Sequence, residues 1–150
     1  MFVREMSEHE CLALVSSHRL GRLGCVKGDR PYVVPIYYAH AGQCLYSFSM
    51  PGQKIEWMRS NPHVCVQVDE FLDRHQWKSV VVHGRYQELP ERGQWHQEHL
   101  RAWSALEAYP NWWEPGGLKP APQEILATSP HLFYCLVIDE VTGRAAVAEG

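Results

Sequence analysis

One short segment of the chain gathers the side chains most able to bind a ligand. Ser47 and Ser49 are followed by Gly52, Gln53 and Lys54, where a strand-like run gives way to a helix-like one. Hydroxyl groups, the main-chain N–H groups of a helix start and one ammonium group together suit a phosphate. A simpler interpretation also fits, in which the two serines are ordinary polar residues at the edge of a sheet and Lys54 is a solvated surface lysine.

Histidines are the other candidates for chemistry. His96 and His99 are three residues apart, which is the spacing of a possible metal pair on a helix. The sequence indicates no third ligand, so a solvated or half-buried role is favoured for both. His40 and His83 could each donate a proton to a substrate, and the pattern selects neither. No Ser-His-Asp order or carboxylate pair can be argued, so catalysis would belong to a bound cofactor.

The composition is that of a globular protein and excludes several classes of partner. The 150 residues carry a net charge of -3 without a long run of Lys or Arg, which argues against nucleic-acid binding. No apolar run approaches the roughly 20 residues that span a bilayer, and the N-terminal segment lacks a signal-peptide core. We expect a cytoplasmic protein with no membrane contact, whose five widely spaced cysteines are reduced thiols in the core.

Hydrophobic period and turn residues predict the elements that position these side chains. In chain order we expect a helix at 7–17, strands at 20–26, 32–40 and 44–49, a helix at 52–60, strands at 63–69 and 77–89, a helix at 91–107 and a strand at 132–139. Gly84 interrupts the long valine-rich strand and predicts a bulge there. Six short strands in meander order predict a single domain over 1–150. It is mainly β with peripheral helices, a six-stranded antiparallel barrel.

Six segments follow one another in an order that is typical of a known family. They are GRLGCV, RPYVVPIYY, CLYSFS, GQKIEWMRSNP, VCVQVDE and WKSVVVHGRYQEL. Their order resembles the FMN-binding split-barrel superfamily, and within it the pyridoxamine 5'-phosphate oxidase-like proteins that include the nitroimidazole-resistance group. The resemblance covers 7–89 and the end strand well, and 91–130 less clearly. It implies a split barrel that binds FMN.

The resemblance also implies roles for single residues. In these proteins the first long strand lies beside the flavin ring, the next strand and corner hold the ribityl chain and phosphate, and the long strand after the helix reaches across a dimer interface. The matching positions are Val34, Pro35, Ile36 and Tyr37 for the ring, Ser47, Phe48, Ser49, Gln53 and Lys54 for the ribityl phosphate, and Trp77 and Ser79 for the partner's flavin. The implied protein is a homodimer with FMN at the subunit interface. From the sequence alone, Trp77 is more often a packing residue.

The chain departs from pyridoxamine phosphate oxidases proper at the ends of the ring-contact strand. Tyr32 and Tyr37 stand where those enzymes have an arginine and a lysine, and the tail VTGRAAVAEG lacks their basic substrate-binding segment. Both departures argue against vitamin B6 oxidation. The resemblance then implies an FMN-dependent oxidoreductase that acts on a small acceptor such as a nitroaromatic or a quinone. The alternatives are a flavin-binding carrier or sensor without turnover, and a split barrel that holds haem or a deazaflavin.

A loop at 109–123 carries four prolines, two glycines and the pair Trp112 and Trp113. Such composition excludes a regular element, and long loops in compact domains are usually functional. Exposed tryptophans are costly, so we expect at least one to cover the flavin pocket or the dimer seam. The alternative is that both pack on their own barrel.

Overall fold

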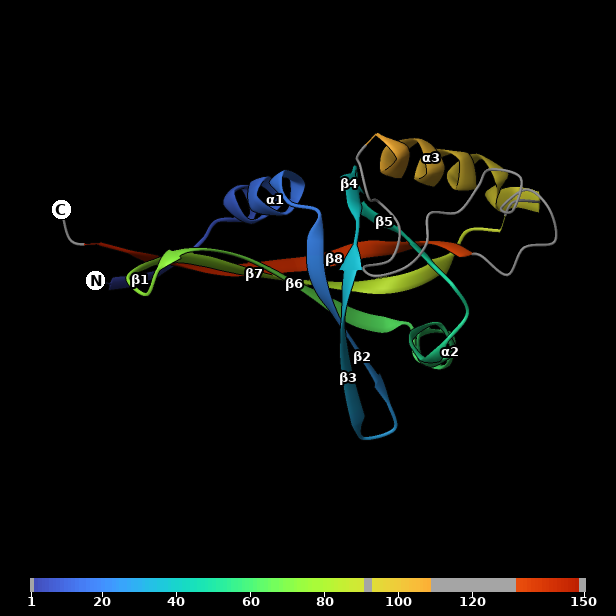
Figure 1. The fold of residues 1–150 in the computed structure, drawn as a ribbon, viewed down its shortest axis with the longest axis horizontal. Helices are drawn as coiled ribbons and strands as arrows, with labels where there is room; N and C mark the ends of the chain where they lie inside the picture. Colours follow the sequence, from blue (N-terminus) through green and yellow to red (C-terminus); the bar gives the residue numbers. More distant parts are fainter. Residues whose placement is uncertain (1, 91–92, 109–131, 149–150) are drawn as a thin grey trace.

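The computed structural model of the protein describes residues 2–90, 93–108 and 132–148 (Figure 1). Its elements are, in chain order, β1 (Phe2–Glu5), α1 (Glu8–Ser17), β2 (Leu20–Lys27), β3 (Arg30–Tyr37), β4 (Ala39–Ala41), β5 (Cys44–Ser49), α2 (Gln53–Ser60), β6 (His63–Asp73), β7 (Gln76–Glu88), a 3-10 turn (Gly93–Trp95), α3 (His96–Glu107) and β8 (Leu132–Val147).

All pairings in the sheet are antiparallel, and the strand order is β3-β2-β6-β7-β8-β5-β4, with β1 added alongside β8. The two end strands, β3 and β4, are consecutive in the chain with Tyr38 between them, so the sheet curves back on itself. The hydroxyl of Ser47 in β5 donates to the carbonyl of Tyr37 across this join, at 2.7 Å. Among the described strands β3 pairs with β2 alone, so the barrel stays split. The predicted split barrel is confirmed.

Alternation along the strands builds the main core. In β6, Val64, Val66 and Val68 are buried, and the residues between them are half-buried on the opposite side. Helix α1 packs on this core through Cys11, Leu14 and Val15, and α2 packs on it through Ile55 and Met58. A second, smaller core lies under α3, where Leu106 and Ala102 meet Phe48 and Phe133.

We call the side of β2, β6, β7 and β8 opposite the main core the outer face. Cross-strand partners place polar and aromatic side chains there in adjacent rows. The residues of the outer face used below are Arg22, Gln67, Asp69, Trp77, Ser79, Thr142 and Arg144. In Figure 1 the β6–β7 hairpin runs out beside β1 and the last part of β8, away from the β2–β3 hairpin.

Local signals predicted the helix ends and one irregularity well. Helix α1 begins with the expected capping box, in which Ser7 and Glu10 bond each other's main-chain N–H groups. The register shifts between His83 and Gly84, as predicted for a bulge. A side chain at Gly84 would place its Cβ 2.5 Å from the carbonyl oxygen of Val137, so only glycine fits this crossing.

Several boundaries differ from the prediction because pairing extends weak strands. The strand predicted at 63–69 continues to Asp73, and the one predicted at 132–139 continues to Val147. The added part of β8 lies between β7 and β1. Main-chain pairing on both sides keeps this segment extended, although its residues are mostly small or polar. Strands β1 and β4 were not predicted. The helix predicted at 91–107 is regular from His96.

Other predictions concern the tryptophan loop, the cysteines, the histidines and the membrane. The Trp112 and Trp113 loop lies outside the described residues. All five cysteines are free thiols, three of them buried. His99 is buried, bonds the carbonyl of Leu89 through its ring nitrogen at 2.9 Å and lies edge-on to Phe133. No helix within the described ranges has the length and apolar character needed to cross a membrane.

Candidate functional site

The strand predicted to line the flavin ring is an edge strand with two different sides. Ile36 is buried and Val34 packs against the main core, so their side chains face inward. Pro35 is exposed and Tyr37 is half-buried on the opposite side. A ring beside β3 would therefore meet Pro35 and Tyr37 through their side chains, and Val34 and Ile36 mainly through main-chain groups.

The three predicted residues of β5 are all buried. The hydroxyl of Ser49 donates to the carbonyl of Met50 at 2.6 Å, as that of Ser47 does to Tyr37. Phe48 lies in the smaller core, edge-on to Phe133 at 5.2 Å between ring centroids. Both serine hydrogens are thus used within the fold. These side chains shape the corner, and their contact with a ligand stays a prediction.

The start of α2 supplies the groups that suit an anion. Gly52 has an extended backbone, no side chain caps the helix, and no atom lies within 4 Å of where a Cβ on Gly52 would be. By contrast, α1 is closed by its capping box. Gln53 is exposed and Lys54 is half-buried beside the main-chain N–H groups of this first turn. This donor set fits a phosphate.

The charge of Lys54 acts on the thiol of Cys25 in the neighbouring strand β2. Burial raises the pKa of the Cys25 thiol in β2, Cys65 raises it further, and Lys54 acts in the opposite direction. Cys25 is a core residue, and the ring of Trp57 in α2 lies 5.6 Å from that of Tyr32. The α2 corner therefore packs on the core side of the β2–β3 hairpin.

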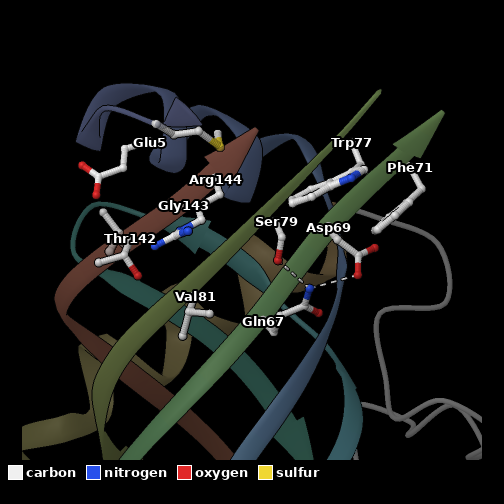
Figure 2. Close-up of a pocket in the computed structure, with 12 residues that line it drawn as sticks. Glu5, Gln67, Asp69, Phe71, Trp77, Ser79, Val81, Thr142, Gly143 and Arg144 are labelled. Carbon is white, nitrogen blue, oxygen red and sulfur yellow. Dashed lines mark hydrogen bonds between the residues drawn. The ribbon is translucent and has the colours of Figure 1, made fainter. Parts of the chain in front are cut away.

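On the outer face, Ser79 belongs to a hydrogen-bonded network that joins three strands. The amide nitrogen of Gln67 donates to the Ser79 hydroxyl at 3.0 Å and to the Asp69 carboxylate at 2.9 Å (Figure 2). Arg22 in turn donates to both Gln67 and Asp69, each at 3.4 Å. Arg22 is also the cross-strand partner of Pro35. The network thus begins next to the ring-contact strand β3 and ends at Ser79.

This network uses the oxygen of Ser79 and leaves its hydroxyl hydrogen available to a ligand. Its oxygen accepts from Gln67, and no acceptor among the described residues takes its own hydrogen. Ser79 differs in this from Ser47 and Ser49, whose hydrogens are already used. A ligand oxygen on the outer face could accept this hydrogen without breaking a bond of the fold.

A cleft of about 840 Å³ opens beside this network. Trp77 lies within it and stacks on Phe71, with ring centroids 5.7 Å apart and planes inclined by 17°. Figure 2 shows both rings at one side of the cleft and Arg144 at the other. The lining residues are Glu5, Met6, Gln67, Asp69, Phe71, Trp77, Ser79, Val81, Val141, Thr142, Gly143 and Arg144.

Comparison with known proteins identifies the family. The profile of the family described as pyridoxamine 5'-phosphate oxidase matches residues 7–145. The chain belongs to this family.

Relatives of this family member extend over nearly its whole length. It is 62% identical over 148 residues to the uncharacterized protein RA0666 of Rhizobium meliloti (strain 1021), and the alignment covers 99% of this chain and 98% of the relative. The crystal structure of an FAD-binding protein from Mesorhizobium loti is 49% identical, with a TM-score of 0.79 and coverage of 97% and 99%. A candidate 5-nitroimidazole antibiotic resistance protein from Bacteroides thetaiotaomicron shares the fold at 15% identity, with a TM-score of 0.70 and coverage of 97% and 89%.

In this pyridoxamine 5'-phosphate oxidase family member, the residues predicted for the phosphate corner and those predicted for the partner's flavin lie on opposite sides of the sheet. The α2 corner, with Gln53 and Lys54, packs on the core side of the sheet, whereas Trp77 and Ser79 lie on the outer face. One chain therefore does not bring Lys54 and Ser79 to the same ligand atom.

Sequence reasoning missed the residues that orient Ser79. Arg22, Gln67 and Asp69 each stand on the polar side of an alternating strand, which is the only signal that marks them. Alternation cannot show that they meet, because β2 and β6 are 45 residues apart at the Arg22–Gln67 contact. The pairing of β2 with β6 creates the network.

Proposed function

We propose that the protein is a homodimeric flavoprotein that binds FMN between its subunits and acts as an oxidoreductase. The proposed reaction would oxidise a nicotinamide or similar donor and reduce a small acceptor of the nitroaromatic or quinone type. The FAD-binding relative from Mesorhizobium loti, at 49% identity over almost the whole chain, supports a flavin cofactor.

The observation that carries the proposal is the separation of the two groups of site residues. The start of α2 suits a phosphate, while Ser79 offers an unused hydrogen on the opposite side of the sheet. A two-fold pair of chains would bring the outer face of one subunit to the α2 corner and edge strand β3 of the other. Each flavin would then be held by both subunits.

The roles of the chain's own residues follow from this arrangement. The open edge of β3 at Val34–Tyr37 would lie beside the ring, the first turn of α2 with Lys54 would hold the phosphate, and the partner's Ser79 would donate a hydrogen bond. The bound flavin would supply the hydride and electron chemistry, and the protein would supply position and electrostatics. Arg22 would fix Gln67, and through it Ser79.

FAD is a second candidate for the cofactor, since the Mesorhizobium loti relative is an FAD-binding protein. FAD contains the ring, ribityl chain and first phosphate of FMN, so the α2 corner would serve either cofactor. The two differ only in the adenosine phosphate that extends beyond the corner. Titration of the cofactor-free protein with riboflavin, FMN and FAD shows which of the three flavins binds most tightly.

One purified sample tests the main proposal. Its absorption spectrum reports a flavin, and distinguishes it from haem or a deazaflavin. Light scattering gives the mass of the flavin-bound species, and a stable monomer of 17.3 kDa with flavin bound would contradict the shared site. Oxidation of NADH or NADPH in the presence of nitroaromatic or quinone acceptors separates an oxidoreductase from a carrier or sensor that binds flavin without turnover.

A further inference from the structure

The outer-face cleft holds more ligand-binding groups than the proposed flavin contacts use. Beyond Trp77 and Ser79 it presents the exposed ring of Phe71, the guanidinium of Arg144 and the carboxylate of Glu5. We propose that this cleft binds an adenosine phosphate, the part that FAD shares with the nicotinamide dinucleotides. The inference rests on the proposed function and deepens it, because it names what lies next to the flavin.

The aromatic pair is suited to a purine base. Phe71 is 62% exposed, although it stacks on Trp77 at a nearly parallel 17°. A large exposed aromatic ring at the edge of a cleft is unfavourable in water and gains from a planar ligand that covers it. Stacking of one base on an aromatic side chain strengthens binding by roughly five- to 150-fold.

Arg144 supplies the charge for a phosphate at the other side of the cleft. It is exposed, and it lies between Ser79 of β7 and Glu5 of β1 as their direct cross-strand partner. Within the described part of the chain its guanidinium makes no ion pair or hydrogen bond. The planar guanidinium matches two phosphate oxygens, and it lies next to Ser79, which belongs to the proposed flavin site.

The carboxylates in the cleft distinguish a nucleotide from a bare phosphate. Asp69 already accepts from Arg22 and Gln67, so its charge is largely balanced. Glu5 is exposed, and its carboxylate suits ribose hydroxyl groups, as acidic residues do in other nucleotide sites. Inorganic phosphate would meet the repulsion of Glu5 without that gain. The cleft volume of about 840 Å³ lies within the range of roughly 300–1,000 Å³ of ligand pockets.

The cleft is continuous with the proposed flavin site, because Trp77 and Ser79 belong to both. A nucleotide bound there would be either the adenosine phosphate half of FAD or that of a nicotinamide donor. The second case would hold the donor beside the ring that it reduces. Both sources share the same chemistry, and titrations with different ligands separate them.

The test uses two substitutions with matched controls in the full-length protein. Arg144→Gln removes the cation, and Arg101→Gln, on the exposed side of α3, is its control. Phe71→Leu removes the ring, and Leu72→Ala is its control because Leu72 is 75% exposed, follows Phe71 directly and does not line the cleft. Calorimetry measures FMN and FAD binding to the cofactor-free protein, NAD⁺ binding to the FMN-loaded protein, and ADP binding to the cofactor-free protein.

Arg144→Gln is expected to weaken FAD or NAD⁺ by roughly tenfold or more and to leave FMN within about twofold. Phe71→Leu should act in the same direction, and the controls should change nothing. A selective loss for FAD identifies the cofactor's own adenosine phosphate, and a selective loss for NAD⁺ identifies the donor. An equal loss for FMN and FAD, or no loss for FAD and NAD⁺ in either variant, overturns the inference.

Failure of the proposed function gives a different result from failure of this inference. If the wild-type protein binds neither FMN nor FAD, the flavin proposal fails, and ADP then tests the cleft alone. If that protein binds ADP, and Arg144→Gln weakens the binding, the result supports the nucleotide site in the cleft. The absence of ADP binding in such a protein would overturn it.

Discussion

Lys54→Ala tests the phosphate corner most directly. In the structure the hydrogens of Ser47 and Ser49 go to main-chain carbonyls, and the N–H groups of α2 cannot be removed by a side-chain change. Lys54 is therefore the charged donor that a single substitution can delete. A charge-assisted contact to a phosphate contributes about 1.5 to 3 kcal/mol, or roughly ten- to a hundred-fold in affinity. FMN affinity should fall by that factor.

Riboflavin provides the comparison, because it has the same ring and ribityl chain without the phosphate. Its affinity should be nearly unchanged in Lys54→Ala, so the preference for FMN should collapse. Pro35→Gly, at the ring, should weaken both ligands alike. Lys27→Ala, at the exposed end of β2, is the matched control and should affect neither.

Calorimetric titration of FMN and riboflavin against each variant makes the measurement, and a thermal melt of each variant checks folding. An equal loss of affinity for FMN and riboflavin in a folded Lys54→Ala protein would refute the reasoning. Lys54 would then support the fold, and the phosphate would bind elsewhere.

Three further predictions concern the dimer, the bulge and the N-terminal ion pair. Ser79→Ala should weaken flavin binding by roughly two- to tenfold, the effect of one neutral hydrogen bond, and leave the mass from light scattering unchanged; loss of the dimer would show that Ser79 acts at the seam instead. Gly84→Ala should lower the free energy of unfolding by about 1 to 3 kcal/mol in urea, since its Cβ would lie 2.5 Å from the Val137 oxygen, and an unchanged value would contradict the close crossing. Hydrogen bonds from Arg4 and Ser7 lower the pKa of Glu10 from 4.5 to about 2, so this carboxylate stabilises the fold above about pH 4.5 and loses that contribution as the pH falls toward 2. Glu10→Gln should flatten this part of a stability curve against pH, and an unchanged curve would contradict the ion pair.

The parts of the fold that the sequence predicted depend on neighbours in the chain. The capping box needs only Ser7 and Glu10, three residues apart, and the β2–β3 and β6–β7 strands are joined by short turns. Gly84 marked its bulge because a glycine inside a valine-rich strand weakens the strand and is typical of a bulge. These features are local, so alternation and turn residues suffice to predict them.

What the sequence did not predict depends on pairing between distant segments. β1 is extended because it lies beside the end of β8, about 140 residues later. The Arg22–Gln67–Asp69 network needs the register of β2 on β6, and the hydroxyl direction of Ser47 needs the closure of the sheet at Tyr37. Residue type alone marked Ser47 as a donor to a ligand, whereas its hydrogen goes to a carbonyl on the neighbouring strand.

The position of β8 in the sheet has a consequence for how the protein is made. β8 pairs with β1, β5 and β7, although all three precede it in the chain. During synthesis, one side of β5 and one side of β7 must therefore wait for the ribosome to deliver residues beyond 131. Until then each presents a row of unpaired main-chain groups, which can join a neighbouring nascent chain as easily as their own. The period before β8 emerges is thus when these strand sides are open to association with other chains.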